Sequence, residues 1–107
     1  MKQFTAMIIT EGSSSVDRCD GIEYEGRDWL VPYWLEPAGG EWKQPERIIP
    51  LDHLPGVQKG NFAGANYVVG APIPKAVLSG PTSPALIARY GVILSPPIRI
   101  ETKRNLN

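Results

Sequence analysis

The chain has little cysteine and no long apolar run, and each shortage excludes a class of protein. Cys19 is the single cysteine among 107 residues, so an intramolecular disulfide is impossible and a disulfide-stapled secreted scaffold is excluded. No stretch approaches the roughly eighteen apolar residues of a transmembrane helix. The opening MKQFTAMIITEG is broken by polar residues and is a poor secretory signal. We therefore expect a single soluble, cytoplasmic domain over residues 1–107, without a membrane partner.

Motifs for metal, cofactor or covalent chemistry are also missing. His53 is the single histidine, and one histidine with one cysteine cannot make a structural zinc site. Neither a G-x-S-x-G nucleophile motif nor a glycine-rich phosphate loop is present. The acidic residues lack the spacing of a calcium loop; they are Asp17, Asp20, Glu23 and Glu25. We therefore expect no metal and no cofactor, and we assign no catalytic residue.

The net charge is zero, but the two halves of the chain differ in sign. Residues 1–57 hold five basic and ten acidic side chains, and residues 58–107 hold six basic and one acidic. One interpretation is that the halves interleave in the fold and neutralise each other; the other is a dipolar molecule with complementary faces. The tryptophans lie in the acidic half, whereas single-strand binders interleave aromatic and basic residues. Nucleic acid is therefore not an expected partner.

Glycine and proline are abundant, with eleven of each, so regular elements must be short and turns frequent. Alternating and β-branched residues predict strands at 2–11, 21–25, 28–36, 47–51, 67–69 and 91–101. The strand at 2–11 is apolar on both sides and is expected in the centre of the sheet. A tight hairpin is expected at 25–28, where Gly26 can take a positive φ. Residues 53–66 read as irregular, and 102–107 as a frayed tail.

Two short helices are indicated by their end signals. In PIPKAVLSG, Pro74 suits the first helical position and Gly80 the position after the end. In SPALIARYG, Ser83 suits the N-cap, Pro84 the first position and Gly91 the end. The whole pattern predicts a mainly β (β-rich α+β) fold: a small, strongly bent antiparallel sheet or an SH3-like half-open barrel with one or two short helices.

The aromatic residues are crowded into YEGRDWLVPYWLEPAGGEW, residues 24–42, which holds all three tryptophans. Pro32 has no amide hydrogen for a ladder, so this strand is a sheet edge, or it bends or ends at that point. As an edge strand it would have one face partly exposed. Exposed aromatics are enriched at protein interfaces. The candidate binding residues are Tyr24, Trp29, Tyr33, Trp34 and Trp42. A pure core role stays open, as does an aromatic pocket for a sugar or a methylammonium group.

Residues 26–47, GRDWLVPYWLEPAGGEWKQPER, resemble the opening of the small-barrel toxin ribonucleases of toxin–antitoxin pairs. That family has a tryptophan strand, then a Pro-x-x-Gly-x-Glu loop, then Arg-Pro before a strand. Here Pro37 and Gly40 have the family's separation, but Glu41 comes one residue early and Pro45-Glu46-Arg47 replaces Arg-Pro. The resemblance implies a small barrel that hydrolyses RNA. It spans only these residues, and we do not assign the chain to the family.

The sequence hypothesis is a small non-enzymatic interaction module, accessory or inhibitory, that binds a protein partner or a second copy of itself, as in a homodimer. The contact would be the aromatic edge strand, by backbone pairing and aromatic anchors. The alternatives are a small barrel enzyme such as a toxin-like ribonuclease and the small-ligand binder. The enzyme would need Arg47, His53 or Asp52 to converge in a cleft with another acid or base.

Overall fold

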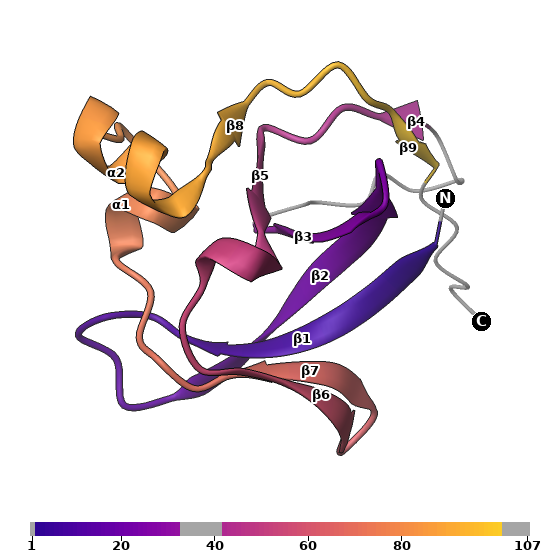
Figure 1. The fold of residues 1–107 in the computed structure, drawn as a ribbon, viewed down its shortest axis with the longest axis vertical. Helices are drawn as coiled ribbons and strands as arrows, with labels where there is room; N and C mark the ends of the chain where they lie inside the picture. The colour runs from indigo at the N-terminus through magenta and orange to yellow at the C-terminus, as the bar shows by residue number, and fades with distance from the viewer. Residues whose placement is uncertain (1, 33–41, 102–107) are drawn as a thin grey trace.

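The computed structural model describes residues 2–32 and 42–101, and the fold is mainly β with two short helices, as the sequence predicts (Figure 1). The expected tail at 102–107 lies outside the described residues. The elements in chain order are β1 Gln3–Ile9, β2 Val16–Tyr24, β3 Arg27–Val31, β4 Trp42–Lys43, β5 Arg47–Pro50, the 3-10 turn η1 Leu51–His53, β6 Val57–Phe62, β7 Ala65–Val69, α1 Lys75–Leu78, α2 Pro84–Tyr90, β8 Ile93–Leu94 and β9 Ile100–Glu101.

Seven strands form one bent sheet in the order β6-β7-β1-β2-β3-β5-β8, and β4 pairs with β9 in a separate two-stranded ribbon. The sheet is mixed rather than purely antiparallel, because β1 and β7 run parallel. β1 lies between β2 and β7, which confirms the central position expected for the first strand. Over residues 2–32 and 42–101 the sheet does not close into a barrel, so β6 and β8 are its edges.

The expectation that the aromatic strand is a sheet edge is wrong for β3. This strand pairs with β2 on one side and with β5 on the other, where Trp29 faces Pro50 and Leu30 faces Ile49. The other expectation, that the strand ends at this point, is confirmed: Pro32 lies one residue beyond the last residue of β3, in a turn, so it interrupts no ladder hydrogen bond. The remainder of the expected strand, residues 33–36, lies outside the described residues.

Apolar side chains cover both faces of the sheet. Because successive side chains of a strand point to opposite faces, neighbouring residues of β3 and β5 enter different clusters. The larger cluster lies against η1, α1 and α2 and includes Ala6, Ile8, Cys19, Leu30, Ile49, Leu51, Leu54, Tyr67, Val69, Ile73, Val77, Leu78, Tyr90 and Val92. The smaller one contains Ile22, Trp29, Val31, Ile48, Ile98 and Ile100. The segment 98–100 therefore covers the sheet face opposite the helices.

The predicted turns and helix ends are largely confirmed. Glu25 and Gly26 both have positive φ, of 53° and 72°, which makes a two-residue hairpin turn between β2 and β3. In α2, the Ser83 side chain accepts a hydrogen bond from the Leu86 amide, and Gly91 ends the helix with φ 65°. Helix α1 differs slightly, since Pro74 is its N-cap rather than its first residue.

Strand β6 was not expected, since its region reads as irregular. It is an edge strand whose middle residues Gln58–Asn61 are exposed, so it lacks the alternating apolar residues that mark a half-buried strand. Its pairing with β7 shifts register between Lys59 and Phe62. A lysine, a glycine and a register shift together make this edge a poor template for further strand pairing.

The sheet order interleaves the two oppositely charged halves. The central strands β1, β2, β3 and β5 come from the acidic half, and β6–β7 and β8 from the basic half flank them on both sides. This order agrees with the interpretation that the two halves interleave in the fold and neutralise each other's charge. Within the part of the chain that the structure describes, neither helix is long and apolar enough to cross a membrane.

Candidate functional site

Trp29 is part of the core rather than of a binding surface. Its side chain is only 3% exposed and belongs to the smaller apolar cluster. The indole Nε1 donates a hydrogen bond to the Tyr24 carbonyl at 2.9 Å, and the two rings lie 6.5 Å apart. The Arg27 guanidinium lies 4.6 Å from the centre of the indole ring, so the position that an external cation would take is occupied from within the chain.

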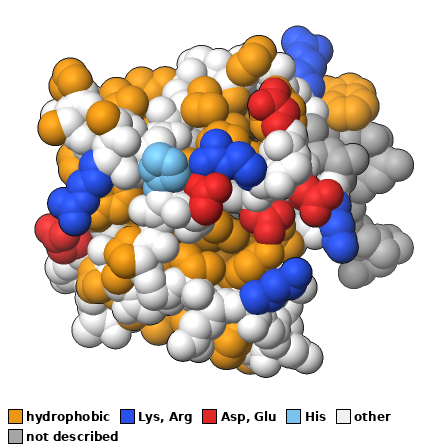
Figure 2. All heavy atoms as spheres, in the orientation of Figure 1, with side chains coloured by type: hydrophobic (Ala, Val, Ile, Leu, Met, Phe, Trp, Pro, Cys, Tyr) orange, Lys and Arg blue, Asp and Glu red, His pale blue; other side chains and the backbone are white. Residues whose placement is uncertain are grey.

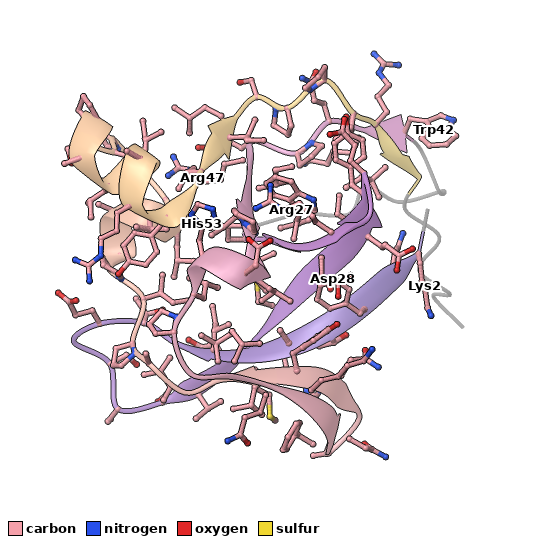
Figure 3. All side chains as sticks on the ribbon, in the orientation of Figure 1. Lys2, Arg27, Asp28, Trp42, Arg47 and His53 are labelled. Carbon is pink, nitrogen blue, oxygen red and sulfur yellow. The ribbon has the colours of Figure 1, made fainter. Side chains whose placement is uncertain are left out.

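The described members of the five aromatic candidates therefore differ in how exposed they are. Tyr24 is half-buried beside Trp29, and Tyr33 and Trp34 lie outside the described residues. Trp42 is 60% exposed, and Figure 3 shows it projecting outward from the end of β4, away from the sheet. Trp42 is thus the one of the three described candidates whose ring is free to contact a partner.

Two exposed apolar residues that the sequence did not single out lie on β8. Leu94 is 48% exposed and Ile93 is 37% exposed, because β8 pairs with β5 on one side and no described strand follows it on the other. Together with Trp42 they make up three of the four large apolar side chains found exposed in residues 2–32 and 42–101. A two-residue edge strand carries no recognisable period, which is why sequence patterning missed it.

A shallow hollow of about 320 Å³ lies next to the β4–β9 ribbon, lined by Gln44, Pro97, Ile98 and Arg99. The chain from 93 to 101 runs beside residues 42–48, as the pairs of β8 with β5 and of β9 with β4 show (Figure 1). Six of the exposed residues of this region are here called the ribbon surface: Trp42, Gln44, Ile93, Leu94, Pro97 and Arg99.

The ribbon surface is poorly suited to backbone pairing. Ser95 has φ 47°, a left-handed conformation that interrupts an extended strand. Pro96 and Pro97 follow it and have no amide hydrogens to donate. A partner would therefore contact this edge mainly through the side chains, and only Ile93 and Leu94 could extend a ladder.

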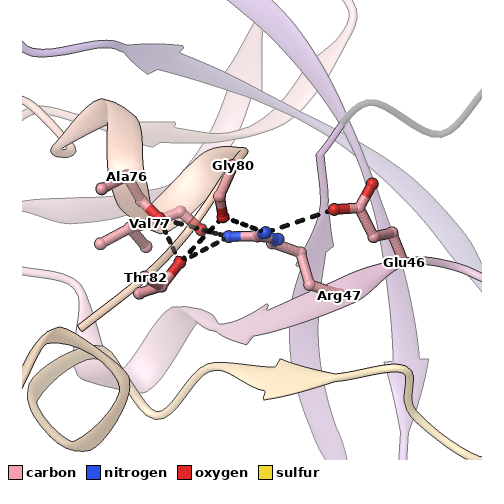
Figure 4. Close-up of polar contacts among 6 residues, drawn as sticks. All are labelled: Glu46, Arg47, Ala76, Val77, Gly80 and Thr82. Atoms are coloured by element: carbon pink, nitrogen blue, oxygen red, sulfur yellow. Dashed lines mark hydrogen bonds and ion pairs between the residues drawn. The ribbon is translucent and has the colours of Figure 1, made fainter. Parts of the chain in front are cut away.

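Arg47 is a candidate for the enzymatic alternative. Its hydrogen bonds hold the segment of chain between α1 and α2 in place (Figure 4). Its side chain is almost fully buried. One terminal nitrogen donates to the carbonyls of Ala76 and Val77 and to the Thr82 hydroxyl, and the other donates to the Gly80 carbonyl at 2.7 Å and to Glu46 at 3.3 Å. A guanidinium bonded in this way anchors backbone and is not open to a substrate.

Asp52 and His53 lie together on η1, but Arg47 does not join them. Asp52 instead accepts two hydrogen bonds from Arg27, at 2.6 and 2.9 Å, and this bidentate contact holds the pKa of Asp52 below its usual range. The His53 Nε2 is 4.0 Å from Asp52. Figures 2 and 3 show this histidine beside acidic and basic side chains on the open surface of the molecule.

The comparisons with known proteins supply no further guide. No protein-family model, curated protein or solved structure matches the chain. Among residues 2–32 and 42–101, no group of three or more histidine, cysteine, aspartate and glutamate side chains is placed to hold a metal ion.

Proposed function

We propose that the chain is a non-enzymatic interaction module that pairs with a second copy of itself through the ribbon surface. The single observation that carries this proposal is the concentration of exposed apolar side chains there. Trp42, Leu94 and Ile93 are each more than a third exposed, and a hollow lined by Gln44, Pro97, Ile98 and Arg99 lies between them along the two paired segments. A tryptophan beside a hollow suits the anchor-and-pocket pattern of protein interfaces.

The charges of the region favour a two-fold contact between identical chains. Glu46 is highly exposed next to the ribbon surface, and Arg99, in the segment between β8 and β9, is exposed as well. A two-fold contact can place Arg99 of one copy against Glu46 of the other, because each surface patch then faces its own equivalent. The chain's zero net charge also removes long-range repulsion between copies.

The contact proposed here differs from backbone pairing along an aromatic edge. Because β3 is an interior strand and prolines follow β8, affinity would come from side-chain burial. A standard interface of about 800 Å² per partner needs a surface wider than two strand residues.

The proposal is tested by replacing residues of the ribbon surface and measuring the mass of the particle by sedimentation velocity. Trp42→Ala and Leu94→Ser should each shift a dimer towards the 11.7 kDa monomer, because both remove apolar contact area. Val16→Ser is the matched control, since Val16 is equally exposed but lies on β2, away from the ribbon. If all three variants retain the mass of the unaltered protein, the ribbon surface is not the contact.

A further inference from the structure

The ribbon surface combines an exposed aromatic ring with a hollow that this ring does not line. Among residues 2–32 and 42–101, Trp42 is the only tryptophan, tyrosine or phenylalanine with an exposed side chain. The hollow of about 320 Å³ begins two residues away, at Gln44, and is here called the ribbon hollow. A larger hollow elsewhere on the sheet, of about 380 Å³, includes Ile8, Val31 and Leu78 in its lining, but nothing in the described residues indicates what would fill it.

Trp42 and the ribbon hollow lie on the same face of the β4–β9 ribbon. Successive side chains of a strand point to opposite faces, so Trp42 and Gln44 point to one side and Lys43 to the other. The Cα partner of Lys43 is Ile100, which is 2% exposed and points to the core. Its neighbour Arg99 is exposed and points outward. A ring and a hollow on one face suit a two-fold contact, because each copy can then give its ring and receive that of its partner.

The lining of the ribbon hollow offers three contacts that fit an indole. The Arg99 guanidinium can lie over the face of the ring, and tryptophan is the side chain that attracts a cation best. Pro97 is exposed and adds an apolar surface. The Gln44 side-chain nitrogen donates a hydrogen bond to the Pro96 carbonyl at 3.1 Å, which orients the amide, and the amide oxygen is an acceptor for the indole N–H.

The chain already contains one pair of this kind in its interior. The Arg27 guanidinium lies 4.6 Å from the centre of the Trp29 ring, and the indole N–H of Trp29 donates to a backbone carbonyl. An arginine that covers a ring can still bind a carboxylate, because the guanidinium presents its face to the ring and its N–H groups at the edge. Arg99 can therefore contact Trp42 and Glu46 of the same second copy.

We propose that the ribbon hollow receives Trp42 of a second copy, so that two indole rings are exchanged across the two-fold axis and each lies against Arg99 of the other chain. The inference rests on the proposed self-association and names its anchor and its pocket. It differs from a contact in which the two Trp42 rings stack on each other at the axis, since that contact would leave both hollows empty.

The exchange is tested by mixing two variants. Trp42→Ala lacks the ring and keeps the hollow, whereas Arg99→Ala keeps the ring and lacks the guanidinium. A dimer of either variant with itself contains no intact pair, but a mixed dimer contains one. The dissociation constants are measured by sedimentation velocity, with a fluorescent label on one variant and increasing amounts of the other, and the amide NMR spectrum of each variant verifies its fold.

The mixed dimer should be tighter than the dimer of either variant with itself. If each Trp42 contact strengthens association about thirtyfold and each Arg99 contact about tenfold, the two self-dimers are weakened about 900-fold and about 100-fold. The mixed dimer loses a single pair as a unit and is weakened only about thirtyfold. If the two residues act independently, the mixed dimer falls between the two self-dimers, at about 300-fold, and the exchange is overturned.

The control is a mixture of Trp42→Ala with Arg89→Ala. Arg89 is exposed on α2 and does not line the ribbon hollow, so this mixed dimer should fall between the two self-dimers. A mixed dimer tighter than both in the control as well would overturn the assignment of Arg99. An unaltered protein that is monomeric overturns the self-association and the exchange together, whereas a dimer whose two variants show no tighter mixed dimer overturns the exchange alone.

Discussion

At the scale of single residues, Arg47 shows how one side chain can hold a small fold together. Its guanidinium donates to the Ala76, Val77 and Gly80 carbonyls around the end of α1. Helix α1 has only four residues, and such a short helix depends on tertiary contacts. Arg47 Nε is itself buried without a partner, a cost that the five other contacts offset.

Arg47→Lys should therefore destabilise the protein by about 2–3 kcal/mol, because an ammonium cannot reproduce the spread of donors and leaves buried carbonyls unsatisfied. The measurement is the free energy of unfolding in urea. Arg99→Lys, at an exposed position, is the control and should change stability by less than about 0.5 kcal/mol. If Arg47→Lys lowers the free energy of unfolding by less than about 0.5 kcal/mol, the anchoring role is refuted.

Gly21 is required by its neighbour rather than by its backbone conformation. It faces Phe4 across the β1–β2 ladder, and a Cβ at Gly21 would lie 2.1 Å from the Phe4 ring. The ring in turn packs edge-on against Tyr67, with centroids 5.0 Å apart. An aromatic ring that covers a glycine on the next strand helps to fix the register of the pair.

Gly21→Ala should cost about 1–3 kcal/mol, as expected for overpacking, and the loss should shrink strongly in a Phe4→Ala background. A double-mutant cycle on unfolding free energies measures this coupling. Equal losses in the two backgrounds would show that the ring does not require the glycine.

At the scale of elements, the hairpin between β6 and β7 contains local strain. Its turn residues Ala63 and Gly64 have φ of 53° and 90°, and an alanine is unfavourable in the left-handed region by about 1–2 kcal/mol. Asparagine tolerates this region far better.

Ala63→Asn should therefore raise stability by about 0.5–1 kcal/mol, measured by thermal unfolding. The Ala63 contact to Arg18 uses the main-chain carbonyl, so the substitution leaves it in place. Ala88→Asn is the control: Ala88 is an exposed residue of α2, and there asparagine should be mildly destabilising. A fall in the melting temperature of Ala63→Asn would contradict the turn geometry.

The elements that the sequence predicts are those with local chemical signals. Helix α2 is identified by its end residues Ser83, Pro84 and Gly91, and the first hairpin by Gly26. Helix caps and turns can be identified in this way because they depend on residues only a few positions apart in the sequence. β6 has no such signal, since its exposed polar residues are stabilised only by pairing with β7. Position within the sheet was misjudged at Pro32, because one residue decides whether a proline breaks a ladder or follows it.

The candidate sites could not be found from sequence for the same reason. Trp42 was identified, but Ile93 and Leu94 are exposed only because β8 is the last strand of the sheet. The larger hollow is lined by Ile8, Val31 and Leu78, which are far apart in the chain. Likewise, no local pattern shows that Arg47 rather than another arginine is buried.

At the scale of the whole molecule, stability should fall at alkaline pH. The pKa of Cys19 is raised from 9.0 to about 12, mainly by burial, and that of Tyr67 from 10.0 to about 12, mainly by its hydrogen bond to Asp28. Between about pH 9 and 12 the unfolded chain loses these protons while the folded chain keeps them. The stability is therefore complete below pH 9 and is lost as the pH rises towards 12.

The measurement is the free energy of unfolding as a function of pH. Cys19→Ala should reduce the fall in the free energy of unfolding that begins near pH 9. Tyr67→Phe should reduce the fall that begins near pH 10. Both effects are expected whatever each substitution does to stability at neutral pH. A slope that neither substitution alters would show that these groups ionise equally in both states.

The proposed self-association is also a property of the whole molecule, and its apolar character separates it from an electrostatic contact between the acidic and basic halves. At moderate ionic strength salt largely screens exposed charges that lie more than about 8–10 Å apart, and this distance shortens as salt is added. Added salt does not weaken apolar burial. The two kinds of contact therefore respond differently to added salt.

The most direct test is the native mass of the unaltered protein over a range of concentrations in low and high salt. The ribbon-surface account predicts a particle of twice 11.7 kDa that persists in high salt. A mass of 11.7 kDa under every condition, or a dimer that dissociates when salt is added, would contradict it.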